Sequence, residues 1–179
     1  MAFVRNQRRG DVWKDVQLVD SIIEKNISTF TLSAKKERDI ESAFTVALQS
    51  NQDRFNGKVI SKIQSDNSVE GITLFGKKNY PDMSLDRDGV AIDLTRIDED
   101  KSRFSQAIGS SFIYRQQYKF VFQIFILTEN AKDVWEEATN DNGNLMDICK
   151  ELSDNEIFIY IIPGFKVKTG SPQIFKVLE

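Results

Sequence analysis

The sequence predicts an α/β fold in which a mixed sheet of about five strands is flanked by helices on both faces. Residues 119–128 and 155–164 are apolar at nearly every position, which is typical of strands buried on both faces. Residues 58–66, 71–81 and 89–97 also have strand character and follow one another through short turns. The early strands therefore predict a meander, and the later strands, which helices separate, predict parallel crossovers.

Four segments carry apolar residues at every third or fourth position, which indicates amphipathic helices that cover the sheet. These segments are 13–26, 34–49, 98–118 and 130–152, the last interrupted at 139–144. Ser33 is expected to cap the second helix. The C-terminal tail is expected to add one edge strand.

The length of 179 residues, 40% of them hydrophobic, predicts a single domain over residues 1–179. Its main body is expected over about residues 34–165, with the helix at 13–26 packed on it. The only cysteine is Cys149, which fits a reducing compartment. No stretch has the layout of a signal peptide or the length of a membrane span, so a cytoplasmic protein with no membrane partner is expected.

The chain contains no histidine, which limits the chemistry open to it. Serine or cysteine catalysis with a histidine base and zinc sites with histidine ligands are excluded. Acid–base or metal chemistry must then use carboxylates, lysines and water. A bound metal is expected to be a hard cation such as Mg²⁺ or Mn²⁺. The formal net charge of −3 gives no overall positive field for nucleic acids, although a local basic patch remains open.

The segment PDMSLDRDGVAIDLTRID, residues 81–98, carries two notable carboxylates. Asp82 follows a proline, and Asp93 interrupts an otherwise apolar strand. Carboxylates are rarely buried unless they are paired or bind a metal, so both are candidate metal ligands and catalytic residues. There is a structural alternative for each residue. Asp82 can be an ordinary turn residue, and Asp93 can accept hydrogen bonds from backbone amides.

A third carboxylate can come from the helix at 34–49. Glu41 is the candidate and Glu37 the alternative, because they lie one turn apart beside the apolar face. An ordinary solvated helix carboxylate is the other interpretation of Glu41. Two or three carboxylates on a rigid sheet edge would hold Mg²⁺ and leave positions for phosphate and water.

These residues resemble the PD-(D/E)XK nuclease superfamily, which has the restriction-endonuclease-like fold. Pro81-Asp82 is similar to the first half of the family motif, and Asp93-Leu94-Thr95 to the second half. The helix and apolar strand at 105–127 resemble the continuation. The resemblance covers roughly residues 34–128 and implies hydrolysis of DNA phosphodiesters with Mg²⁺ or Mn²⁺ at Asp82, Asp93 and Glu41.

Thr95 stands where the family has a lysine that polarises the attacking water or stabilises developing charge. In one interpretation a basic residue from elsewhere takes its place, with Lys77, Lys78, Arg115 and Lys119 as candidates. Arg96 is a poor substitute because alternation points it to the opposite face. In a second interpretation Gln106 or Gln116 orients water or phosphate. In a third, the fold is kept and cleavage is lost.

Arg115, Gln116 and Lys119, together with Lys77 and Lys78, are candidates for contact with DNA. A solvated helix end is an equally good interpretation of the first three. The alternative function is that of an inactive nuclease-fold protein, a DNA-binding or structural subunit of a restriction, repair or mobile-element complex. A generic α/β protein of another role is the third hypothesis. A homodimer or a protein partner is expected, because an acidic monomer would bind DNA weakly.

Overall fold

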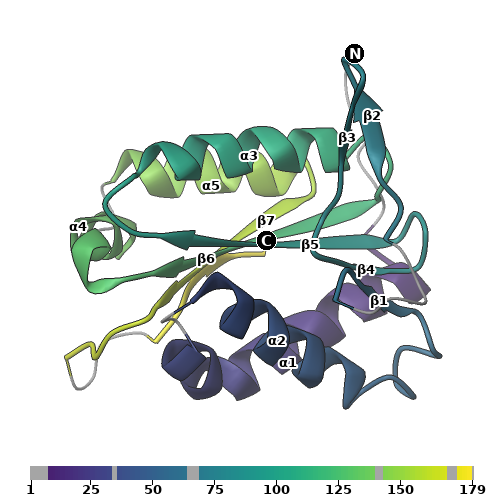
Figure 1. The fold of residues 1–179 in the computed structure, drawn as a ribbon, viewed down its shortest axis with the longest axis horizontal. Helices are drawn as coiled ribbons and strands as arrows, with labels where there is room; N and C mark the ends of the chain where they lie inside the picture. The colour runs from purple at the N-terminus through teal and green to yellow at the C-terminus, as the bar shows by residue number, and fades with distance from the viewer. Residues whose placement is uncertain (1–7, 34–35, 64–68, 140–142, 169–172, 179) are drawn as a thin grey trace.

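The computed structural model describes residues 8–33, 36–63, 69–139, 143–168 and 173–178. After two N-terminal helices, five strands follow one another along the chain, and helices then separate β5, β6 and β7 (Figure 1). The helices are α1 (Asp11–Ser33), α2 (Glu37–Gln49), α3 (Ser102–Tyr114), the 3-10 turn η1 (Glu129–Ala131), α4 (Lys132–Ala138) and α5 (Asn144–Asp154). The strands are β1 (Val59–Ser61), β2 (Ile72–Leu74), β3 (Lys77–Asn79), β4 (Met83–Leu85), β5 (Val90–Ile97), β6 (Phe120–Leu127), β7 (Ile157–Pro163) and β8 (Phe175–Val177).

A mixed sheet of six strands in the order β1-β4-β5-β6-β7-β8 forms the centre of the described structure. β5, β6 and β7 are parallel, whereas β1, β4 and β8 join antiparallel. The predicted α/β class and the mixed sheet are thereby confirmed. The sheet has six strands because β8, the edge strand expected from the tail, joins the five that were expected.

Helices cover both faces of this sheet, as predicted (Figure 1). α1 and α2 lie on one face, and α3 and α5 on the other. Alternation along β6 divides its side chains between the two layers. Phe122 and Ile124 pack toward α1 and α2, while Val121 and Phe125 pack toward α3 and the helices that follow it. The central strands therefore read as continuous apolar runs because both of their faces are buried.

Each predicted helix is found, but the boundaries differ, most of all for the first helix, which was expected over 13–26 and extends to Ser33. The expected cap, Ser33, is instead the last residue of α1, and Lys36 precedes α2 without a side-chain cap. α1 continues this far because its apolar stripe reaches Phe30, which is fully buried and stacks on Phe44 of α2 at 3.7 Å between ring centroids. Residues 34–35 lie outside the described part of the chain.

The segment at 71–81 was expected to be one strand of the meander, and this prediction is wrong. It folds as a hairpin, β2 and β3, which forms a separate two-stranded sheet. The two turn residues, Phe75 and Gly76, both have positive φ (49° and 76°), as the tight turn of a two-residue hairpin requires. β4 occupies the position in the main sheet that was expected for the segment at 71–81.

The strand expected at 58–66 is β1, which is shorter, and residues 64–68 lie outside the described part. The interruption of the last helix is confirmed by the separate α4 and α5, and the tail supplies β8 as the expected edge strand. Over the residues that the structure describes, none of the helices combines the length and the apolar character needed to cross a membrane.

Candidate active site

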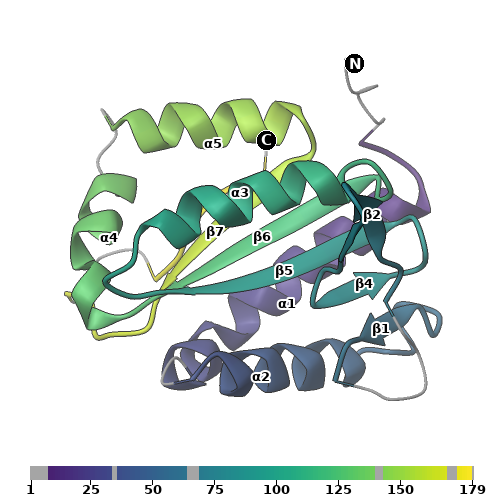
Figure 2. The same ribbon diagram turned by 45° about the horizontal axis from the view of Figure 1, so that its top comes forward.

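The candidate site lies where β4 and β5 separate (Figure 2). The two strands pair from Leu85 opposite Val90 to Met83 opposite Ile92, and the pairing then ends. Asp82 is the first residue beyond the last pair, and its Oδ2 accepts a hydrogen bond from the backbone N–H of Leu94 at 2.8 Å. The carboxylate thus replaces a strand as the partner of the β5 edge, which fixes its position.

Asp93 extends from β5 toward the face that α3 covers. The Tyr114 hydroxyl lies 3.4 Å from Asp93 Oδ1 and 3.0 Å from the backbone oxygen of Tyr80. Gln123 lies directly opposite Asp93 on β6. Both ends of its side-chain amide have hydrogen-bond partners when the amide nitrogen donates to Asp93 Oδ2 at 3.2 Å. Its amide oxygen then accepts from the Thr95 hydroxyl at 3.2 Å. Asp93 is therefore buried, 9% exposed, within a polar cluster.

Lys62 is the cation of the site. Its Nζ lies 2.9 Å from Oδ1 of Asp82, and its backbone N–H donates to the Asp82 carbonyl at 3.0 Å. The second bond extends the pairing of β1 with β4 by one residue, so the two side chains are neighbours across adjacent strands. The Lys62 side chain remains 39% exposed, so its ammonium group borders solvent.

Lys62 was absent from the residues predicted for the site. A short strand at 58–66 was recognised, but the sequence did not show that it pairs with the strand that begins after Asp82. Cross-strand pairing brings together Lys62 and Asp82, which are 20 positions apart in the sequence. Nothing in the spacing of the residues around either one indicates that they meet.

Glu41 approaches the same cluster from α2. Its pKa is raised, first by burial and then by the negative charge of Asp82, while Lys62 acts in the opposite direction. Glu37, the alternative, forms an ion pair with Arg103 of α3 at 2.6 Å. Arg103 also donates to the Arg96 carbonyl on β5 at 2.9 Å. Of the two glutamates, Glu41 is the one electrostatically coupled to both Asp82 and Lys62.

The site has more negative than positive charge. The pKa of Asp93 is raised to about 8, first by burial and then by the charge of Asp82, against the opposing effect of Lys62. Lys62 opposes the rise of the pKa at both Asp93 and Glu41, and Arg38 also opposes it at Glu41. Bringing a cation to this cluster would favour the ionised form of Asp93.

The site offers carboxylate oxygens, which are the type of donor atom that a hard cation prefers. Among the described residues, no group of three or more histidine, cysteine or acidic side chains is arranged to hold a metal ion. Magnesium, however, is commonly held by one or two carboxylates together with substrate phosphate and water. Asp82 and Asp93 fit this mode, because both are oxygen ligands with fixed backbones in a region of excess negative charge.

The other predicted catalytic residues lie in different surroundings. Thr95 is 7% exposed and belongs to the Asp93 cluster through Gln123. Gln106 is exposed on α3, and Gln116 is exposed just beyond the end of that helix. Gln123, which was not predicted, is the glutamine that contacts Asp93.

The predicted DNA-binding residues also differ in exposure. Lys77 and Lys78 are exposed on β3. Lys119 is exposed and forms an ion pair with Asp88 at 3.2 Å. Arg115 is 7% exposed, and its guanidinium donates to the backbone oxygens of Asn155 and Tyr118 at 2.9 and 2.5 Å. These bonds tie the end of α3 to the turn before β7, which is a structural role.

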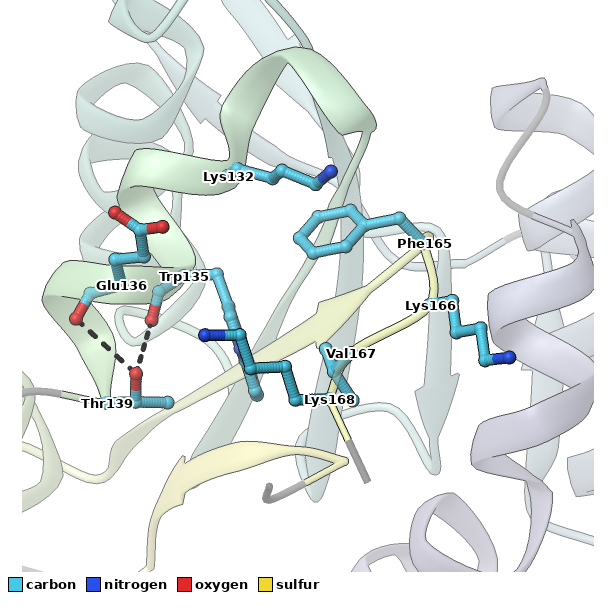
Figure 3. A pocket seen from close by; sticks show the side chains of 8 residues that line it. All are labelled: Lys132, Trp135, Glu136, Thr139, Phe165, Lys166, Val167 and Lys168. Carbon is cyan, nitrogen blue, oxygen red and sulfur yellow. Dashed lines mark hydrogen bonds between the residues drawn. The ribbon is translucent and has the colours of Figure 1, made fainter. Parts of the chain in front are cut away.

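A hollow of about 390 Å³ lies elsewhere, at the carboxyl ends of β6 and β7 (Figure 3). Its walls are α4 and the loop that follows β7, and the Lys132 ammonium lies 5.4 Å from the centre of the Phe165 ring. Its lining residues are Lys132, Trp135, Glu136, Thr139, Phe165, Lys166, Val167 and Lys168. None of them belongs to the acidic cluster, so the candidate chemistry and this hollow are separate features.

Comparison of the chain with models of protein families, with curated proteins and with solved structures finds no match. The residues of the site are consequently the basis for inferring function. The point where β4 and β5 separate, here called the strand fork, brings Asp82, Asp93 and Lys62 together. The charge of Glu41 couples to this group. Such an arrangement can hold a cation and place an ammonium group beside it.

Proposed function

We propose that this chain is a metal-dependent nuclease with a restriction-endonuclease-like fold, which hydrolyses phosphodiester bonds of DNA with Mg²⁺ or Mn²⁺. The observation that carries the proposal is the strand fork, where Asp82 and Lys62 form an ion pair at 2.9 Å beside the buried Asp93. These are two oxygen ligands and one cation in a chain that has no histidine.

Asp82 and Asp93 would hold the metal, with Glu41 assisting. A divalent cation bound there stabilises charge that develops on phosphate oxygens and lowers the pKa of the attacking water. Lys62 takes the role of the family's lysine from a different strand. Because its side chain is 39% exposed, its ammonium group can contact the attacking water or a phosphate oxygen while it stays beside Asp82.

The remaining residues of the cluster position Asp93. Gln123 donates to its Oδ2 and accepts from Thr95, and Tyr114 lies against its Oδ1. These contacts hold the carboxylate in one orientation at the β5 edge, which pre-organises a ligand before the substrate arrives. Thr95 therefore supports the site through Gln123 and leaves the positive charge to Lys62.

Incubation of the purified chain with plasmid and with single-stranded DNA in Mg²⁺ or Mn²⁺ tests this function. Cleavage is expected, and Asp93→Ala is expected to abolish it. Asp147→Ala is the matched control, because Asp147 is exposed on α5 outside the cluster. Absence of cleavage by the pure protein across both substrates and both metals would contradict an active nuclease.

The second candidate function is a catalytically inactive nuclease-fold protein that serves as a DNA-binding or structural subunit. Thr95 in place of the family's lysine and the net charge of −3 favour it. It predicts DNA binding without turnover, or a stable protein partner. Calorimetry separates the two functions, because tight Mn²⁺ binding that is lost in Asp82→Ala supports the metal-dependent enzyme.

A further inference from the structure

The tip of the β2–β3 hairpin exposes an aromatic side chain completely. Phe75 is 99% exposed, whereas the largest aromatic side chains of the sheet layers are buried. Its neighbour Leu74 is 41% exposed, and Lys77 and Lys78 follow directly on β3. The tip therefore combines an apolar ring with two cations, outside either hydrophobic core.

The backbone at Phe75 adds a second, independent observation. Its φ of 49° lies in the left-handed region, which bulky side chains rarely adopt and which two-residue hairpin turns normally fill with Asn or Gly. The phenyl ring gains no burial in return for this strain. A strained residue with no packing role in the free chain is a candidate for a role in binding.

The base of the hairpin is held firmly against the rest of the molecule. The Tyr118 hydroxyl donates to the Glu70 carbonyl at 3.0 Å, and the Tyr114 hydroxyl donates to the Tyr80 carbonyl at 3.0 Å. The Tyr80 ring packs so closely on Gly71 that a Cβ there would come within 2.3 Å of it. The tip is thus presented on a fixed support, which lowers the entropy cost of binding through it.

The hairpin is also continuous with the candidate active site. β3 leads through Tyr80 and Pro81 directly to Asp82. Tyr114 contacts both the carbonyl of Tyr80 and the carboxylate of Asp93, so one hydroxyl joins the hairpin base to the acidic cluster. The hairpin projects beyond the sheet at the end of α3 (Figure 1). One continuous stretch of chain, residues 75–82, thus joins the tip to the cluster.

We propose that Phe75 stacks on an unpaired base of the DNA strand held at the cluster, while Lys77 and Lys78 contact its phosphates. This inference rests on the proposed function. An exposed ring flanked by lysines suits a single strand, because every base offers a face for stacking and phosphates offer the matching charge. Binding through the tip would be tolerant of sequence and would set which phosphate reaches Asp82 and Asp93.

Phe75→Asn tests the role of the ring without disturbing the turn, because Asn is favoured at this turn position. Binding of a fluorescein-labelled single-stranded oligonucleotide is measured in EDTA, so that no cleavage occurs. Stacking on one base predicts an affinity at least fivefold lower for Phe75→Asn than for the natural chain. An oligonucleotide with 2-aminopurine is expected to change its fluorescence with the natural chain and to change less with the variant.

Ile148→Gln is the control, because Ile148 is another exposed apolar residue, 47% exposed, on α5. Equal affinity of Phe75→Asn and the natural chain would overturn the proposal, even if the natural chain cleaves DNA. An equal loss in Ile148→Gln would also overturn it. Cleavage by the natural chain is measured separately, so failure of the nuclease function is seen independently of the hairpin. Phe75-dependent binding to anionic lipid vesicles without DNA binding would assign the tip to a membrane surface instead.

Discussion

Lys62 shows how a site can receive its positive charge from a neighbouring strand. A lysine at position 95 would lie beside Asp93 on β5, where Thr95 is 7% exposed and bonded to Gln123. Lys62 instead reaches Asp82 from β1 at the outer edge of the sheet, with its side chain 39% exposed. A lysine at the edge avoids most of the desolvation cost of a buried ammonium group, which makes it the less costly way to place a cation there.

The first prediction concerns this exchange of positions. If Lys62 supplies the charge, Lys62→Met is expected to lower the cleavage rate about 100-fold, because electrostatic stabilisation by one group is of this size. Adding Thr95→Lys to that variant is expected to recover part of the rate, since the new ammonium group would lie beside Asp93. Steady-state cleavage of a fluorescent oligonucleotide measures both.

Lys58→Met is the control for the loss of a lysine, since Lys58 pairs with Asp15 at 3.0 Å away from the cluster. A Lys62→Met rate within twofold of the natural chain would show that Lys62 has no part in the reaction. Circular dichroism of each variant verifies that the fold is retained.

The second prediction follows from the raised pKa of Asp93. Its folded pKa of about 8 lies above its ordinary value of 3.8, so the folded state binds the proton more tightly. The resulting stabilisation is fully present below about pH 4 and is lost as pH rises through about 8. In EDTA, the free energy of unfolding is expected to fall less between pH 5 and pH 9 for Asp93→Asn than for the natural chain. The difference is expected to be at least about 1 kcal/mol, because one pKa unit corresponds to about 1.4 kcal/mol.

Urea unfolding at pH 5, 7 and 9 measures this difference. Glu41→Gln is a useful comparison, because the pKa of Glu41 is raised in the same direction. Parallel pH profiles for Asp93→Asn and the natural chain would mean that Asp93 ionises in the folded state as it does in the unfolded chain. Saturating Mn²⁺ is expected to stabilise the natural chain most at high pH, where Asp93 is ionised.

The sequence could identify Asp82 and Asp93 because each breaks a local pattern, the first after a proline and the second within an apolar strand. Lys62 breaks no local pattern, whereas Gln123 interrupts the apolar strand β6 as Asp93 interrupts β5. Lys62 reaches the site through pairing of β1 with β4, and Gln123 through the parallel register of β5 with β6. Those pairings are tertiary, so neither residue could be selected from spacing along the chain.

At the scale of elements, the long strands and helices were predictable and the short ones were not. β5 and β6 each have eight residues that are almost all buried, which makes them recognisable from composition alone. β4 has only three residues, and its sequence does not distinguish a strand from a turn. The hairpin was missed because Phe75 occupies a turn position that normally carries Asn or Gly.

The third prediction concerns the attachment of α2, the helix that carries Glu41. Phe44 is 2% exposed and stacks on Phe30 of α1 at 3.7 Å. Phe44→Ala is expected to lower the free energy of unfolding by about 3–5 kcal/mol, because it removes a buried ring and leaves a cavity between the helices. Urea unfolding followed by circular dichroism measures the loss.

Val46→Ala, two residues further on the same helix, is the matched control. Val46 is 62% exposed, so this variant is expected to stay within about 0.5 kcal/mol of the natural chain. A similar cost for both substitutions would indicate that packing against α1 does not determine the effect, since alanine favours the helix at both positions. It would then be wrong to treat α2 as fixed by the Phe30–Phe44 contact.

At the scale of the whole molecule, charge is distributed unevenly. The net charge is −3, yet lysines are found on the exposed hairpin strand β3 and around the hollow at the ends of β6 and β7. A chain with this balance has no long-range attraction for DNA, so its affinity must come from a few local contacts. The salt dependence of binding therefore reports how many phosphates the protein contacts.

The last prediction uses that dependence to locate the DNA. On single-stranded DNA, each phosphate contact contributes about 0.7 to the slope of log K against log salt concentration. If Lys77 and Lys78 each contact one phosphate, replacing both with alanine is expected to reduce the magnitude of this negative slope by about 1.4. Lys132→Ala and Lys166→Ala together are the control, because these lysines line the distant hollow. A slope that falls only in the second pair would place the DNA at the hollow and away from Asp82, Asp93 and Lys62.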